Sequence, residues 1–210
     1  MTHLDYSHQD AWYIQHTGYV QSPININSNT ATVINYNADL KLHYDKTALY
    51  AKDTGQALEV GLTGQALINN RPYILQQFHL HTPSEHTIDH TYHDGELHFV
   101  HQADDGKLAV IAIFLQLGSA SPSLAAMFSH LNKNRTFDLP ISDLLPKNKS
   151  YFHYVGSLTT PPLSENVDWY ILSEPISVSS NQIKDLHRFY PHNNRHLQAL
   201  NQRPILYYKA

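Results

Sequence analysis

The chain has 210 residues, and its 18 Asp and Glu side chains outnumber the 14 Lys and Arg, which gives a formal net charge of -4. The length fits one domain, so residues 1–210 are expected to form a single domain. The acidic balance argues against a nucleic-acid partner, because binding to phosphates requires a basic face. Cysteine is absent, which excludes disulfide scaffolds, thiolate zinc sites, iron–sulfur clusters and a cysteine nucleophile. Any metal site must therefore use imidazole and carboxylate ligands.

Membrane and export signals are weak in this sequence. The longest apolar run, residues 108–115, is much shorter than the ~20 residues that a membrane span needs. The first residues have neither the basic nor the apolar region of a signal peptide. We therefore expect no membrane partner and a cytoplasmic location, while a chain from which a signal segment had been removed would look the same.

Short apolar segments separated by Gly, Pro, Asn and Asp indicate a β-rich chain. The clearest predicted strands cover residues 56–60, 73–81, 96–102, 108–117 and 167–172. The segment 108–117 is apolar almost throughout, which predicts a central strand that is buried on both faces.

Two helices are predicted from their capping residues. The first begins after Ser121, which can act as N-cap, with Pro122 at the first helical position. The second begins after Ser179, and Gln182 stands three residues later as the partner in a capping box. We therefore expect a mostly β domain with a few short peripheral helices.

Histidine is abundant, with 16 residues, and one histidine cluster follows the geometry of strands. Side chains alternate between the two faces of a strand, so Gln77, His79 and His81 share one face. By the same rule, Glu96 and His98 share one face of the strand that follows. If these strands pair, three imidazoles converge, and three imidazoles with an open fourth position form the ligand set of a catalytic zinc site.

Two of these histidines also have an acceptor at a fixed spacing. Gln77 precedes His79 by two residues, and Glu96 precedes His98 in the same way. A histidine that binds a metal usually donates its second ring N–H to such an oxygen. The repeated placement favours a metal site over a hydrogen-bonded polar cluster within a barrel.

Six ordered segments resemble the α-class carbonic anhydrases, and the similarity extends over nearly the whole chain. The matching segments are residues 21–26, 77–86, 96–101, 108–115, 156–163 and 174–180. The resemblance implies a large, twisted, mainly antiparallel central sheet with zinc at the floor of a conical cavity. The short connection from His81 to Glu85 resembles bacterial members, because it lacks the insertion typical of animal members.

The resemblance also implies a chemistry and assigns residues to it. It makes His79, His81 and His98 the ligands of Zn2+, and it implies reversible hydration of CO2 to bicarbonate and a proton by attack of zinc-bound hydroxide. Thr159 matches the residue that accepts a hydrogen bond from this hydroxide and donates one to a buried carboxylate, here Glu85. Sulfonamides and anions are the expected inhibitors. The positions that match the substrate pocket are Val100, Val110, Leu158, Thr160 and Trp169.

One position departs from the family pattern. Gln56 aligns with the histidine that exports protons in fast members, and an amide cannot titrate. We therefore expect proton export to limit turnover unless buffer or another group accepts the proton. The other residues expected along a proton pathway are Tyr6 and Glu59, with His3 near the rim.

Two other functions stay open at this point. The same site can hydrolyse activated esters as a side activity, and a non-catalytic protein can use the many histidines to bind zinc or buffer protons. A storage protein has no need of the Glu85–Thr159 pair, which therefore favours the enzyme. The sequence leaves the oligomeric state open.

Overall fold

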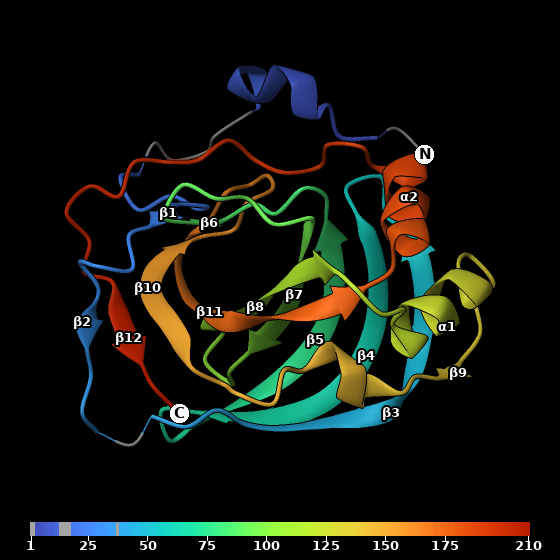
Figure 1. Ribbon diagram of the computed structural model, residues 1–210, viewed down its shortest axis with the longest axis horizontal. Helices are drawn as coiled ribbons and strands as arrows, with labels where there is room; N and C mark the ends of the chain where they lie inside the picture. Colours follow the sequence, from blue (N-terminus) through green and yellow to red (C-terminus); the bar gives the residue numbers. More distant parts are fainter. Residues whose placement is uncertain (1–2, 13–17, 37) are drawn as a thin grey trace.

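A computed structural model describes residues 3–12, 18–36 and 38–210, and it is built around one large curved sheet (Figure 1). In spatial order, the ten strands of this sheet are β2 (Thr32–Val33), β12 (Leu206–Tyr208), β10 (Tyr151–Ser157), β11 (Glu165–Val178), β8 (Leu108–Leu117), β7 (Gly95–Gln102), β5 (Arg71–His81), β4 (Leu58–Ile68), β3 (Lys41–Asp53) and β9 (Phe137–Asp138). Neighbours are antiparallel except for β11 with β8 and β12 with β2. A separate parallel pair joins β1 (Asn25–Ile26) and β6 (Thr87–Ile88). The predicted mostly β fold with a mainly antiparallel sheet is confirmed.

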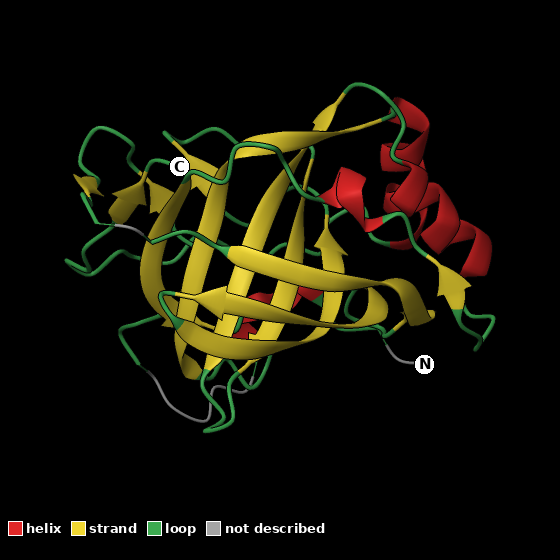
Figure 2. Ribbon diagram, turned by 90° about the horizontal axis from the view of Figure 1, so that it is seen from below, coloured by secondary structure: helices red, strands yellow, loops and turns green. Residues whose placement is uncertain are grey.

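Short helices lie at one side of this sheet. The α-helices α1 (Pro122–His130) and α2 (Ser180–Phe189) lie together near β3 and β9, as Figures 1 and 2 show. Two 3-10 segments, η1 (Tyr6–Ala11) and η2 (Ile141–Leu144), complete the helical elements of the described residues. Within the described ranges, no helix combines the length and apolarity needed to cross a membrane.

Both predicted N-caps are present. The Ser121 hydroxyl accepts a hydrogen bond from the backbone N–H of Leu124 at 3.1 Å. The Ser179 hydroxyl accepts one from the N–H of Gln182 at 3.3 Å, and the Gln182 side chain accepts the N–H of Ser179 at 3.1 Å. Each helix therefore begins where its capping sequence predicts.

All five predicted strands occur, and β8 is the buried central strand, with residues 109–115 buried. Residues 56–60 contribute only the beginning of β4, whereas residues 167–172 form the middle of β11. The long strands β3 and β10 were missed. Most of β3 is exposed or half-buried, and charged residues near both ends interrupt its pattern, so its apolar stretch at residues 48–51 was not recognised as part of a strand.

The two faces of the sheet bury two separate sets of side chains. Phe78 and Phe99 belong to the larger core, and their ring centroids are 5.3 Å apart. His79 and His98 are cross-strand partners on the opposite face, where a second core contains Trp169. Alternation along β5 and β7 thus places histidines on one face and core residues on the other.

The chain that follows α2 crosses the histidine side of the molecule. In Figure 1 this red segment runs between η1 and the sheet. Gln9 in η1 holds it there, because its side chain donates to the Asn194 carbonyl at 3.0 Å and accepts the N–H of His196 at 2.8 Å. Residues from the end of the chain are therefore brought onto the histidine cluster.

Candidate metal centre

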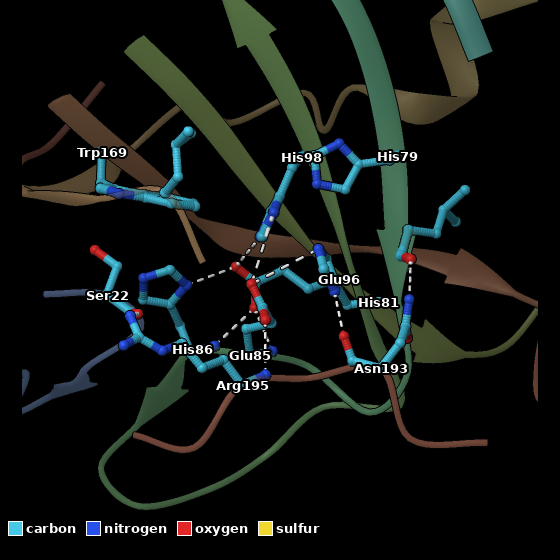
Figure 3. A network of polar contacts seen from close by, with 12 residues as sticks. Ser22, His79, His81, Glu85, His86, Glu96, His98, Trp169, Asn193 and Arg195 are labelled. Atoms are coloured by element: carbon cyan, nitrogen blue, oxygen red, sulfur yellow. Dashed lines mark hydrogen bonds and ion pairs between the residues drawn. The ribbon is translucent and has the colours of Figure 1, made fainter. Parts of the chain in front are cut away.

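Three histidines converge on one point between β5 and β7. His79 lies directly opposite His98 in the antiparallel pairing, and His81 follows two residues later on the same face. One ring nitrogen from each lies within 4.8 Å of the others. The ring centroids are 4.7 to 5.2 Å apart, and Figure 3 shows the rings gathered around one point. This arrangement allows three imidazoles to bind a single ion.

Two of the three rings are held by the acceptors that the spacing predicts. Nδ1 of His79 is hydrogen-bonded to Oε1 of Gln77 at 2.9 Å. Nε2 of His98 is hydrogen-bonded to Oε1 of Glu96 at 2.9 Å. These contacts leave Nε2 of His79 and Nδ1 of His98 as the nitrogens available to a metal, since each ring has used its other nitrogen.

The acceptor for the third ring was not found from the sequence. Nδ1 of His81 is hydrogen-bonded to the backbone carbonyl of Asn193 at 2.6 Å. The Asn193 side chain fixes this segment, because it accepts the N–H of Thr82 at 2.8 Å and donates to the Leu80 carbonyl at 3.0 Å. A backbone carbonyl is present at every residue, so no sequence signal marks this one.

Burial keeps His79 and His81 in the protonation state that a metal needs. Burial, reinforced by the neighbouring His81 and His98, holds the pKa of His79 well below its usual range. Burial also lowers the pKa of His81, although Glu85 opposes the shift. A neutral imidazole keeps a lone pair on its free nitrogen, so both rings are suited to bind a cation.

Glu96 connects this centre to a second polar cluster. Its Oε2 accepts the N–H groups of Glu85 and His86 at 2.8 Å each, and its Oε1 contacts Nδ1 of His86 at 2.7 Å as well as Nε2 of His98. Burial works to raise the pKa of Glu96, but His86 and His98 outweigh it and hold that pKa well below its usual range. The other ring nitrogen of His86 is hydrogen-bonded to Tyr154 at 2.7 Å.

Two groups of side chains have metal-like spacing in the described residues, and they differ in what their atoms already contact. In the group formed by His86, Glu96 and His98, both nitrogens of His86 have hydrogen bonds. In the group formed by His79, His81 and His98, Nε2 of His81 is buried and has no hydrogen bond. The second group is therefore the candidate metal centre.

The unpartnered atoms provide a test of whether a metal fits. Among the described residues, His81 Nε2 and Glu85 Oε2 are the buried side-chain atoms without a hydrogen bond, and they lie 3.6 Å apart. A buried polar group left unpaired costs about 1–3 kcal/mol. Zn2+ binds neutral imidazole nitrogens in a tetrahedral set and would satisfy His81. The donor set therefore fits zinc.

One oxygen of Glu85 is held by the segment after α2, and the other has no hydrogen bond. Its Oε1 accepts the backbone N–H of Arg195 at 2.8 Å, and its Oε2 lies 4.0 Å from Nδ1 of His98. Thr159 is buried, but the described residues contain no hydrogen bond between Thr159 and Glu85. Arg195 also donates to the Ser22 carbonyl at 2.7 Å. It was missed because it acts on Glu85 through a backbone amide.

A cavity of about 240 Å³ opens beside the histidines. The residues of the predicted site that line it are Gln56, Glu59, Gln77, His79, His81, Val100, Leu158 and Thr160. The lining residues that were not predicted are Thr54, Ala57 and Leu108. Val110 and Trp169 are buried and do not line it. Trp169 instead packs edge-on against His98, with 4.9 Å between the ring centroids, so it supports the imidazole of a candidate ligand.

The predicted proton pathway contains no titratable side chain at position 56. Gln56 is exposed, and its carbonyl accepts the hydroxyl of Tyr6 at 3.1 Å. Burial raises the pKa of Tyr6, so this hydroxyl does not release a proton near neutral pH. His3 lies outside the cavity lining, with its Nε2 3.5 Å from Oδ2 of Asp53.

Comparison with known proteins agrees with this geometry. A model of the family described as eukaryotic-type carbonic anhydrase matches residues 7–209. The chain belongs to this family. A carbonic anhydrase from Nostoc sp. is 36% identical over 200 residues, which cover 90% of this chain and 76% of that protein. The predicted family and enzyme class are confirmed.

Solved carbonic anhydrases share the fold as well. The α-carbonic anhydrase from Thermovibrio ammonificans, in complex with the inhibitor sulfanilamide, has a TM-score of 0.83 and 32% identity, covering 90% of this chain and 87% of that chain. A carbonic anhydrase from Chlamydomonas reinhardtii, in complex with acetazolamide, has a TM-score of 0.82 and 34% identity, covering 91% of each chain. The carbonic anhydrase fold therefore extends over most of this chain.

Proposed function

We propose that this member of the carbonic anhydrase family is a zinc enzyme that hydrates CO2 reversibly to bicarbonate and a proton. The observation that carries the proposal is the set of three converging imidazoles, each held through its other ring nitrogen, at the edge of a cavity. Zinc, when bound, supplies a nucleophilic hydroxide near neutral pH by lowering the pKa of water to about 7, an effect for which carbonic anhydrase is the type example.

Three histidines of the chain would hold the metal, and their hydrogen-bond partners orient the rings. His79 and His81 would bind through Nε2, and His98 through Nδ1. Gln77 and Glu96 fix two of these rings through their other nitrogens, so little ordering is needed on binding. The centre is therefore preorganised.

The cavity wall suits an uncharged substrate. Val100, Leu108 and Leu158 offer apolar surface to CO2 beside the histidines. We propose that Thr159 donates its hydroxyl hydrogen to Glu85 Oε2 in the working enzyme, which fixes the orientation of the Thr159 oxygen. The support for this role is that Oε2 is buried and has no hydrogen bond. Such a contact positions reactants and does not transfer a proton.

Stopped-flow measurement of CO2 hydration on the zinc-loaded chain tests the proposal. We expect one tightly bound zinc and measurable turnover. A His98→Ala variant should lose both, because only two of the three imidazole ligands remain. His187→Ala is the matched control, since His187 is exposed on α2. Several loosely bound zinc ions without CO2 hydration would instead favour the non-catalytic zinc protein.

Proton export is a separate part of the proposal. Because Gln56 lines the cavity and cannot titrate, turnover should rise with buffer concentration. A Gln56→His variant should turn over faster than the parent at low buffer, and the difference should shrink at high buffer. Equal turnover of parent and variant at low buffer would show that another group already exports the proton.

A further inference from the structure

One carboxylate stands in the wall of the cavity beside the candidate metal centre. In the part of the chain that the structure describes, Glu59 is the only Asp, Glu, Lys or Arg among the lining residues. We propose that Glu59 forms a cation-selective subsite, which favours occupants with a protonated amine over occupants with an anionic group. This inference rests on the proposed function, because it concerns ligands that bind in the same cavity.

Strand pairing places Glu59 on the face that carries the histidines. Glu59 pairs with His79 across β4 and β5, and with Lys52 across β3 and β4. Tyr50 pairs with Gly61 in the same register. Cross-strand partners point to the same side of a sheet, so Lys52 and Tyr50 reach Glu59 while Glu59 faces the cavity.

A glycine allows the neighbouring tyrosine to fix this carboxylate. A Cβ added to Gly61 would lie 2.3 Å from Cε1 of Tyr50. The Tyr50 ring can therefore lie over β4 only because residue 61 has no side chain. The Tyr50 hydroxyl donates to Oε1 of Glu59 at 2.8 Å, and Nζ of Lys52 lies 3.0 Å from the same oxygen. Both contacts use Oε1, which leaves Oε2 without a hydrogen bond to any described residue.

The electrostatic field inside the cavity depends on where the Glu59 carboxylate and the Lys52 ammonium lie. The Glu59 side chain is 19% exposed and lines the cavity, whereas the Lys52 side chain is 46% exposed and does not. Water therefore screens the ammonium more strongly than the carboxylate. The other polar side chains of the wall, such as Gln56 and Thr160, carry no formal charge. An occupant of the cavity thus meets a net negative wall at Glu59.

Isothermal titration calorimetry with two sulfonamides tests this subsite through binding, independently of turnover. The probes are 4-(aminomethyl)benzenesulfonamide and 4-carboxybenzenesulfonamide, which share the sulfonamide and differ in the charge at the other end. The measured quantity is the ratio of their dissociation constants in each zinc-loaded protein. Differences intrinsic to the two probes cancel when this ratio is compared between variants.

Substitution of Glu59 and of Lys52 should shift the ratio of the two dissociation constants in opposite directions. Glu59→Gln keeps an acceptor for Tyr50 but removes the charge, so the preference for the amine should fall by roughly ten- to fifty-fold, because attraction of the amine and repulsion of the carboxylate are both lost for unit charges ~7 Å apart in a partly solvated cavity. Lys52→Gln removes the compensating ammonium, so the preference should rise. Glu174→Gln, at an exposed position on β11, should leave the ratio unchanged.

The outcomes separate this inference from the proposed function. If both probes bind Glu59→Gln with an unchanged ratio of dissociation constants, the cation-selective subsite is overturned, but the proposed zinc enzyme is not. An equal shift in Glu174→Gln also overturns it, because net charge then accounts for the effect. Failure of both probes to bind the zinc-loaded parent overturns the proposed function and the subsite together.

Discussion

At the scale of single residues, the three histidines are distinguished by what their second nitrogens contact. His79 and His81 use Nδ1 for the Gln77 oxygen and the Asn193 carbonyl, whereas His98 uses Nε2 for Glu96. The acceptor therefore selects which nitrogen faces the centre. Because these acceptors fix the orientation of the rings, their removal should weaken metal binding even where all three histidines are kept.

Two adjacent glutamines allow this to be measured. Gln77→Ala removes the acceptor for His79, and we expect the zinc dissociation constant to rise by about ten-fold or more. Gln76→Ala is the control, because Gln76 is exposed and, among the described residues, its side chain donates a hydrogen bond to the Ile74 carbonyl alone. Competition with a fluorescent chelator gives both constants. Equal zinc affinity in the two variants would show that Gln77 does not support the ligand.

At the scale of elements, α1 and α2 begin beside each other and share one side chain. Gln182 completes the capping box of α2 through the N–H of Ser179. The same Oε1 accepts the N–H of Ser121 at 2.9 Å, and Nε2 donates to the Ser121 carbonyl at 2.6 Å. Gln182 is buried, so its loss leaves backbone groups of both helix starts without partners.

Gln182→Ala is therefore expected to lower the free energy of unfolding by about 1–3 kcal/mol, through a lost cap and unpaired buried backbone groups. Lys184→Ala tests the same helix at an exposed position and should change stability by less than about 0.5 kcal/mol. Urea denaturation followed by circular dichroism measures both. A loss of similar size in the two variants would contradict a specific role for Gln182.

At the scale of the whole molecule, the sheet separates the candidate metal centre from the larger core, yet that core contains a histidine. His101 is fully buried on β7, with Nε2 2.8 Å from the Tyr44 hydroxyl and Nδ1 3.3 Å from the Ala109 carbonyl. Burial lowers its pKa from 6.5 to about 4. The unfolded chain therefore binds a proton at a pH where the folded chain does not.

The sign of the pH dependence follows from this difference. The contribution of His101 is fully present above about pH 6.5 and is lost as the pH falls toward 4. The total loss is of order 3 kcal/mol, since one pKa unit corresponds to about 1.4 kcal/mol. His101→Gln should thus show a smaller loss of unfolding free energy than the parent between about pH 7.5 and 4.5. His43→Gln, at an exposed position, should follow the parent, and a parallel decline in all three proteins would contradict the prediction.

Local sequence was sufficient to predict the features that depend on residues close to one another in the chain. Alternation along β5 and β7 predicted that His79, His81 and His98 converge and that Gln77 and Glu96 stand behind two of them. The capping residues predicted where both helices begin. These inferences succeeded because strand alternation and helix capping act over two to four residues, a distance at which side-chain identity is informative.

Contacts between distant segments were decided only by the tertiary structure. The carbonyl of Asn193 and the amide of Arg195 reach the centre because the segment after α2 folds back over the sheet. Backbone atoms are the same at every residue, so residue identity does not indicate which backbone groups make these contacts. The Lys52 contact with Glu59 likewise depends on the register between β4 and β3, and β3 was not predicted from the sequence.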